Sequence, residues 1–334
     1  MWRQYIQSNF NGCLTVMSPI TLNWKQIEPL VQKIDIYDAM KNAFIEYSKG
    51  NAVIPPVGEL IMDQPVGEVH IKYGYIRGGN HYVIKIASGF SGNEEKGIKP
   101  GQGMMLLFDI KTGVPEAILI DEANLTDIRT GIAGAIASQT LSNNNIETVA
   151  IVGTGVQARY QARYLSDLMN IKRIIIWGRD AQKADKVKED LLNLGIDIHV
   201  ETDLREMVNH SRLIITTTSS KEPLIHSDWV NPGTHITAVG SDTPEKYELD
   251  PLILAKADLV VADSLEQNLI RGEIHQAIKR SVIDPADVTE LGEILDQQKP
   301  GRVNEDSITI ADLTGVAVQD LVIAQSVLEA SKET

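Results

Sequence analysis

The chain has 334 residues, of which 43% are hydrophobic and 23% are charged. This length is enough for about two domains, each with its own core. Forty-five acidic residues against 31 basic ones give a net charge of −14, which argues against nucleic-acid binding because that function needs a basic face. The single cysteine, Cys13, excludes an internal disulfide and a cysteine-cluster zinc site.

The apolar runs are shorter than the roughly 18–20 residues that span a bilayer, and residues 1–13 are too polar for a signal-peptide core. Seven histidines are scattered without the spacing of metal ligands. We therefore expect a cytoplasmic globular protein that acts on a small molecule, with no membrane, nucleic-acid or metal partner.

The first part of the chain predicts one helix followed by a series of strands. Asp35 can cap a helix over residues 36–49, in which apolar residues recur at helical spacing, and Gly50 ends the run. Five apolar segments separated by turn-rich pieces then follow, at residues 58–62, 68–76, 81–89, 103–110 and 115–121. Strands with few helices between them predict an antiparallel or mixed sheet.

The pattern changes near residue 126. Residues 126–141 predict a helix rich in Ala and Gly, which would let a neighbouring element approach closely. Apolar strands then alternate with helices at 155–169 and 181–194. The strands lie at residues 148–153, 173–178, 196–200, 213–218, 235–240, 258–263 and 308–313. This alternation is typical of a buried parallel sheet, and an amphipathic helix closes the chain.

The clearest local motif is the turn that Gly153, Gly155 and Ala158 form after the strand at 148–153. In this G-x-G-x-x-A pattern, the first glycine allows the tight turn and the second lets the backbone approach a pyrophosphate. The small third residue lets helix and strand pack closely. The motif predicts a Rossmann-type dinucleotide site.

The end of the next strand bears on the choice of dinucleotide. NAD sites place an acid there, which binds the ribose 2′-hydroxyl. Here Gly178 occupies the position and Arg179 follows it. A guanidinium suits a 2′-phosphate, so NADP(H) is favoured over NAD(H). In the alternative, Arg179 is a solvated surface residue and Asp180 binds the ribose.

Four segments together resemble the ornithine cyclodeaminase and mu-crystallin family in order and spacing. They are residues 125–137, 151–161, 232–250 and 308–320. The resemblance covers the chain from about residue 20 onward. Residues 55–57, 67–78 and 89–103 are most similar to the branch associated with ectoine utilisation.

The family resemblance implies an α/β fold with two domains. A Rossmann-type doubly wound parallel sheet would span residues 126–314. A smaller α+β domain for substrate and dimerisation would span residues 1–125, completed by the C-terminal helix at 315–334. It also implies a homodimer and NAD(P)-linked chemistry at an imine.

Three residues match positions that carry the family's chemistry. Lys85 matches the lysine that faces the substrate carboxylate or carbonyl oxygen, and Arg129 matches the arginine that binds the carboxylate near the nicotinamide. Asp242 matches the acid that gives and takes the proton. The alternatives are ordinary ones: a solvated strand lysine, an ion-paired arginine and an aspartate that caps a turn.

Further matches imply contacts with the cofactor. These residues are Val156, Gln157, Thr218, Val239, Gly240, Lys246 and Leu313. Leu313 departs from the serine of ornithine cyclodeaminase, so its contact would come from the backbone.

One departure from the family concerns substrate binding. Ornithine cyclodeaminase has an arginine after the first helix, but residues 50–62 contain none. Lys72 in the following strand could compensate. Together with Gly178, the missing arginine favours reductive chemistry over ornithine cyclisation.

The sequence therefore predicts an NAD(P)H-dependent imine or ketimine reductase acting at an α-imino or α-amino carboxylate. One alternative is an ornithine cyclodeaminase that makes proline and ammonia while recycling NAD. A second is a non-catalytic binding protein of the mu-crystallin type. The joint presence of Lys85, Arg129 and Asp242 argues against the second, because a binder need not keep a proton donor.

Overall fold

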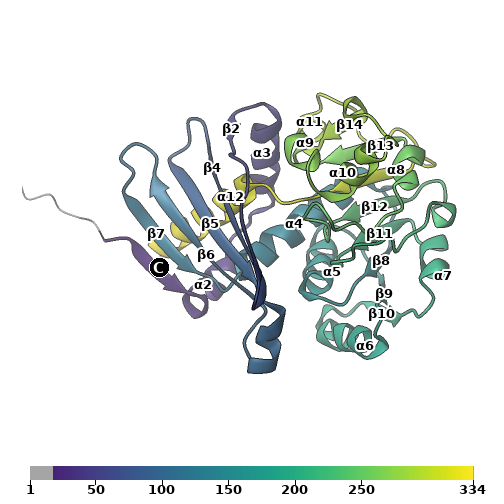
Figure 1. Cartoon of the computed structure of the whole chain (residues 1–334), viewed down its shortest axis with the longest axis horizontal. Coiled ribbons are helices and arrows are strands. Elements are labelled where there is room, and N and C mark those ends of the chain that lie inside the picture. The colour runs from purple at the N-terminus through teal and green to yellow at the C-terminus, as the bar shows by residue number, and fades with distance from the viewer. Residues whose placement is uncertain (1–17, 334) are drawn as a thin grey trace, which may run out of the picture.

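The computed structural model describes residues 18–333, so Cys13 lies outside the described part. The chain forms two β-sheets, with α4 between them and α12 lying across the first sheet (Figure 1). Within residues 18–333 no helix has the length and apolar character needed to cross a membrane.

The first sheet has seven strands in the order β1-β7-β6-β5-β4-β2, with β3 paired to β4. The strands are β1 (Ile20–Asn23), β2 (Ala52–Val53), β3 (Gly58–Asp63), β4 (Val66–Ile76), β5 (His81–Gly89), β6 (Gly101–Asp109) and β7 (Pro115–Ile120). Only β1 and β7 pair in parallel, which confirms the mixed sheet. The short elements β1, β2 and α2 (Trp24–Val31) were not predicted from the sequence.

The first predicted helix is α3 (Tyr37–Ser48). It begins one residue later than expected, because Ile36 and not Asp35 is its N-cap residue. The Asp35 carboxylate still accepts a hydrogen bond from the Tyr37 amide, at 3.2 Å. The buried face of α3 presents Met40, Ala43 and Phe44 to the core.

The second sheet has eight parallel strands in the order β10-β9-β8-β11-β12-β15-β13-β14. They are β8 (Thr148–Val152), β9 (Arg173–Trp177), β10 (Asp197–Val200), β11 (Leu213–Thr216), β12 (His235–Ala238), β13 (Leu259–Ala262), β14 (Val288–Glu290) and β15 (Thr309–Asp312). The strand order reverses between β8 and β11, which is where ligands bind in doubly wound sheets. The Rossmann-type parallel sheet is confirmed.

Helices flank this sheet. They are α4 (Asn124–Leu141), α5 (Val156–Leu168), α6 (Ala181–Asp190), α7 (Leu204–Asn209), α8 (Leu252–Lys256), α9 (Leu265–Asn268), α10 (Gly272–Lys279) and α11 (Leu291–Leu295). The small residues of α4 admit α5 at close range. A Cβ at Gly134 would lie 2.1 Å from Gln161 Oε1, and one at Gly131 would lie 2.6 Å from the Tyr164 ring.

The last helix, α12 (Ala317–Lys332), returns to the first sheet. It packs against β4, β5, β6, α3 and α4, and Figure 1 shows it in yellow across that sheet. Most of its buried residues are apolar, but Gln319 and Asp320 are fully buried too. This polar pair faces the site described next.

Candidate active site

The turn between β8 and α5 fits a dinucleotide pyrophosphate. Gly153 has φ +131°, and a Cβ there would lie 2.2 Å from Thr217 Oγ1. Gly155 is the N-cap residue of α5, and no side chain caps this helix terminus. Its first amides therefore stay available to an anion. The turn lines a cavity of about 280 Å³.

The same cavity extends to the end of β9. Gly178 lines it, and a Cβ at this position would lie 2.4 Å from Thr154 Cγ2. An acid at residue 178 is therefore excluded as long as Thr154 keeps its place. Arg179 and Lys183 also line the cavity. Asp180 caps α6, because its Oδ1 accepts hydrogen bonds from the amides of residues 182 and 183.

The remaining residues expected at the cofactor lie at several places. Thr218 lines the same cavity, and Val156 lines an adjoining one of about 510 Å³ with Arg159, Lys183 and Lys186. The Gln157 side chain donates instead to Asp127 of α4.

Three more residues expected at the cofactor, Val239, Gly240 and Leu313, lie just beyond the ends of β12 and β15. The Val239 amide donates to Thr216 O at 3.0 Å, and the Leu313 amide donates to Ala238 O at 2.9 Å. A Cβ at Gly240 would lie 2.1 Å from Thr218 O. These residues form the carboxyl edge of the parallel sheet.

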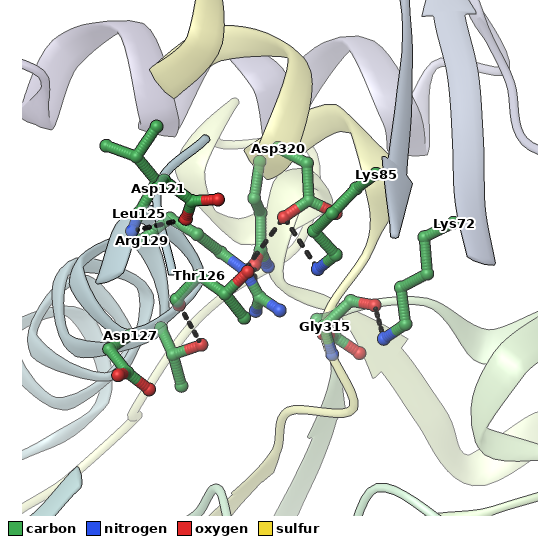
Figure 2. A network of polar contacts seen from close by, with 12 residues as sticks. Lys72, Lys85, Asp121, Leu125, Thr126, Asp127, Arg129, Gly315 and Asp320 are labelled. Atoms are coloured by element: carbon green, nitrogen blue, oxygen red, sulfur yellow. Dashed lines mark hydrogen bonds and ion pairs between the residues drawn. The ribbon is translucent and has the colours of Figure 1, made fainter. Parts of the chain in front are cut away.

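The two predicted carboxylate-binding cations meet at one oxygen. Lys85 Nζ lies 2.9 Å from Asp320 Oδ1, and Arg129 Nε lies 3.0 Å from the same atom (Figure 2). Arg129 Nη1 also donates to Gln319 Oε1 at 2.8 Å. Lys85 comes from β5, Arg129 from α4 and Asp320 from α12. All three side chains are buried.

Sequence reasoning missed Asp320 and Gln319. A Gln-Asp pair within the apolar first half of α12 was the available signal, since buried charges are rarely left without partners. Burial lowers the pKa of Lys85 to about 8, and the Arg129 charge adds to this effect. Burial on its own would raise the pKa of Asp320, but the surrounding cations hold it below its ordinary value.

Lys72 of β4 is a third buried cation in the same place. It stands directly opposite Lys85 in the β4–β5 pairing. Its Nζ donates to Gly315 O at 2.6 Å and to Thr314 O at 3.0 Å. A Cβ at Gly315 would lie 2.7 Å from Arg129 Nη1, so this glycine separates Lys72 from Arg129. Burial lowers the pKa of Lys72 to about 7, and the Lys85 and Arg129 charges lower it further.

Asp242 lies in the loop after β12, with 44% of its side chain exposed. Its Oδ1 lies 2.8 Å from Lys246 Nζ, so this lysine, which was expected at the cofactor, is an ion-pair partner of Asp242. Burial on its own would raise the pKa of Asp242, but the Lys246 ammonium lowers it to about 2. Asp242 is therefore a carboxylate at neutral pH in this arrangement.

The Asp242 loop is also tied to the β3–β4 hairpin. Arg271 Nη1 donates to the backbone oxygen of Asp242 at 3.1 Å, and Arg271 Nη2 lies 3.0 Å from Glu59 Oε1 of β3. Lys246 Nζ lies 3.9 Å from Glu68 Oε1 of β4. The two sheets therefore meet across the site through charged contacts.

Two buried acids hold the loops at the carboxyl edge of the parallel sheet. Glu248 accepts hydrogen bonds from the Thr218 amide at 2.6 Å and the Gly240 amide at 3.2 Å. Glu273 accepts from Ser241 Oγ at 2.5 Å and from the amides of residues 248 and 249. Sequence reasoning identified neither acid, because nothing local distinguishes them from surface glutamates. In the described part of the chain, no three His, Cys, Asp or Glu side chains are grouped to hold a metal ion.

Comparison with known proteins matches this architecture. Residues 18–334 match the ornithine cyclodeaminase/mu-crystallin family. An uncharacterised cyclodeaminase of Sinorhizobium fredii is 40% identical, over 92% of this chain and 94% of its own length.

Two solved structures superpose over almost the whole chain. Δ1-pyrroline-2-carboxylate reductase of Thermococcus litoralis, in complex with NADH and L-proline, has a TM-score of 0.88 and 29% identity over 94% of this chain and 98% of its own. An archaeal alanine dehydrogenase dimer with bound NAD has a TM-score of 0.86 and 32% identity, covering 95% and 98%. This chain belongs to the ornithine cyclodeaminase/mu-crystallin family.

Proposed function

We propose that this enzyme is an NAD(P)H-dependent imine reductase that converts an α-imino carboxylate into an α-amino carboxylate. The observation that carries the proposal is the meeting of Lys85 and Arg129 at Asp320, beside the carboxyl edge of the Rossmann sheet. Its similarity to a pyrroline-2-carboxylate reductase and an alanine dehydrogenase supports the same reaction class.

The residues have distinct tasks in this reaction. Lys85 and Arg129 bind the α-carboxylate, for which the planar guanidinium offers paired donors. Asp242, as a carboxylate, accepts a hydrogen bond from the protonated imine nitrogen and so orients the C=N bond. Reduced nicotinamide, when bound, supplies the hydride to the imine carbon.

The electron and proton balance is then complete. The C=N π electrons move to nitrogen as the hydride reaches carbon, and the nitrogen keeps its protons. The resulting amine takes one more proton from solvent to become the ammonium. In the reverse direction, Asp242 is the acceptor for the proton that leaves the amine.

The first experiment follows absorbance at 340 nm with NADPH and, separately, NADH. The substrates are pyrroline-2-carboxylate and pyruvate with ammonia or methylamine. Asp242→Asn should lower kcat by about 10²-fold or more while NADPH binding stays near that of the wild type. Asp228→Asn is the matched control, since this carboxylate is 68% exposed.

Two results would contradict this proposal. One is full activity in Asp242→Asn, which would contradict the role given to Asp242. The other is release of ammonia from L-ornithine plus NAD without net formation of reduced cofactor, which is the signature of a cyclodeaminase.

We propose further that NADPH is the preferred cofactor. A side chain at residue 178 would meet the Thr154 methyl group, so Gly178 does not provide the acid of an NAD site, whereas Arg179 and Lys183 offer positive charge at the same cavity. Arg179→Ala should raise the KM for NADPH about tenfold and leave the KM for NADH nearly unchanged, because one charge-assisted contact is lost. Arg205→Ala, on α7, is the control. Equal changes for both cofactors would contradict the preference.

We also propose a homodimer. The alanine dehydrogenase in the comparison is a dimer, and the β3–β4 hairpin here exposes Leu60 (59%), Ile61 (66%) and Val66 (71%). Several large apolar side chains exposed on one hairpin favour an interface. Light scattering after size exclusion should give twice the chain mass, and Ile61→Asp should shift the protein toward the monomer. A wild-type monomer at micromolar concentration would contradict the dimer.

A further inference from the structure

Two lysines lie directly opposite each other inside the first sheet. Lys72 on β4 and Lys85 on β5 are register partners, with only 8% and 2% of their surface exposed. Like charges at directly opposed positions destabilise a sheet, and burial adds the cost of removing each ammonium from water. Such an arrangement needs a compensating partner.

Lys85 has that partner and Lys72 does not. Lys85 shares Asp320 with Arg129. The contacts of Lys72 in the described structure are the backbone oxygens of residues 314 and 315. An ammonium has three N–H donors, so one remains for a ligand.

The other acids near Lys72 are already engaged. Asp263 contacts the same turn, where it accepts from the Gly315 amide at 2.7 Å and from Thr314 Oγ1 at 3.1 Å. Asp242 is paired with Lys246. Neither contacts the Lys72 ammonium.

The three basic groups are unequally provided with carboxylates. Lys85 and Arg129 share Asp320, whereas Lys72 contacts no carboxylate in the described structure. The α-carboxylate of an imino acid can bind Lys85 and Arg129. A second acidic group on the same molecule would give Lys72 the acceptor that it lacks, and Lys72 and Arg129 both lie beside Gly315.

We infer that Lys72 is a specificity-determining residue that binds a second carboxylate of the substrate, so that the preferred substrate is a short dicarboxylic imino acid. This inference rests on the proposed function and defines its substrate class. A different arrangement, with Lys72 on the shared α-carboxylate, is an outcome of the test below.

The test compares pairs of 2-oxo acids of equal length, each with ammonia and NADPH. Oxaloacetate is paired with 2-oxobutyrate, and 2-oxoglutarate with 2-oxopentanoate. The wild type should show a kcat/KM at least about tenfold higher for one or both dicarboxylic members, as expected for one extra charge-assisted hydrogen bond.

Lys72→Met should lower the ratio of the two kcat/KM values by roughly 10- to 100-fold, because it removes the second anchor. Lys72→Arg should retain most of the preference for the dicarboxylic member of each pair, because it keeps a positive charge at this position. Lys111→Met, which removes an exposed lysine from the β6–β7 turn, should leave it unchanged. Thermal unfolding and NADPH binding establish that each variant is folded.

A second readout does not depend on turnover. In the presence of NADP⁺, L-aspartate should raise the melting temperature of the wild type more than L-2-aminobutyrate does. Lys72→Met should remove that difference. Persistence of the full difference in a folded variant would overturn the role of Lys72.

The outcomes separate the two proposals. If the wild type reduces monocarboxylic imines as well as dicarboxylic ones, or if Lys72→Met lowers both equally, the inference is wrong and the proposed function stands. If the wild type reduces no imine with either cofactor, the proposed function fails and this inference falls with it.

Discussion

The two sides of the site bury different ionisable groups for different purposes. On the side of the first sheet, Lys72, Lys85 and Arg129 converge around one carboxylate, Asp320. On the Rossmann side, Glu248 and Glu273 lie under the loops that follow β11 and β12.

The difference lies in how completely the charges are satisfied. The buried acids accept hydrogen bonds from backbone amides, so they hold loops in place without a ligand. The cations keep donors that no group in the described structure accepts from, so they suit a ligand. Buried acids with complete hydrogen bonding hold the loops in place, and buried basic groups with spare donors suit a ligand.

The largest expected effect is the loss of the carboxylate on the cationic side. Asp320→Ala leaves Lys85 and Arg129 without their shared partner, and breaking a buried pair in this way costs about 3–5 kcal/mol. The free energy of unfolding in urea measures it. Asp228→Ala, at an exposed position, should stay within about 0.5 kcal/mol of the wild type. A loss under about 1 kcal/mol for Asp320→Ala would contradict the account of the cationic side.

A somewhat smaller effect is expected on the acidic side. Glu248→Ala leaves the amides of the partly buried residues Thr218 and Gly240 without acceptors, which should cost about 1–3 kcal/mol in total. The same urea titration measures this loss, and NADPH affinity should fall with it because Thr218 lines the cofactor cavity. Glu222→Ala, an exposed acid in the same loop region, is the control. Unchanged NADPH affinity in a destabilised variant would limit Glu248 to a role in folding.

The two sides should also change the free energy of unfolding in opposite directions as the pH rises. Burial and the neighbouring Glu273 raise the pKa of Glu248 from 4.5 to about 8, so between these values the folded chain holds a proton that the unfolded chain has released. The contribution of Glu248 to the free energy of unfolding therefore falls as pH rises across that range, by up to about 1.4 kcal/mol per unit. The pKa of Lys85 is lowered from 10.5 to about 8, so between these values the unfolded chain holds a proton that the folded chain has released. The contribution of Lys85 to the free energy of unfolding therefore rises with pH over that range.

Difference curves isolate these two contributions. Subtracting the unfolding free energy of Glu248→Gln from that of the wild type at each pH should give a falling curve between about pH 4.5 and 8. The same subtraction with Lys85→Met should give a rising curve between about pH 8 and 10.5. Flat curves in these ranges would show that the groups do not titrate as described.

The smallest effect on stability is expected at Lys246, where the two sides meet. Lys246→Met should cost less than about 1 kcal/mol, because Asp242 is partly exposed and such ion pairs contribute little. Its effect on catalysis should be larger than this cost suggests. Removing the ammonium raises the pKa of Asp242, so kcat/KM should decline at a higher pH on the acid side than in the wild type. Lys279→Met, at an exposed position, is the control. If kcat/KM of Lys246→Met declines at the same acid pH as in the wild type, the pairing of Lys246 with Asp242 is contradicted.

The sequence predicted well what local pattern encodes. Most strands of both sheets, the glycine turn at 153–155 and the Ala- and Gly-rich helix α4 follow from side-chain period and turn chemistry. Family resemblance then pointed to Lys85, Arg129 and Asp242. Elements of only two to six residues, such as β2 and α7, were missed because so few residues carry no clear period.

What sequence alone determined about this protein is therefore its class: a dinucleotide-binding α/β fold with cations for a carboxylate and an acid at a strand end. Only the tertiary structure decided how the charges are paired. Asp320 lies 235 positions from Lys85 along the chain, and Lys72 lies 243 positions from Gly315. Such pairings have no local signal, because they exist only when α12 returns to the first sheet and closes one side of the site.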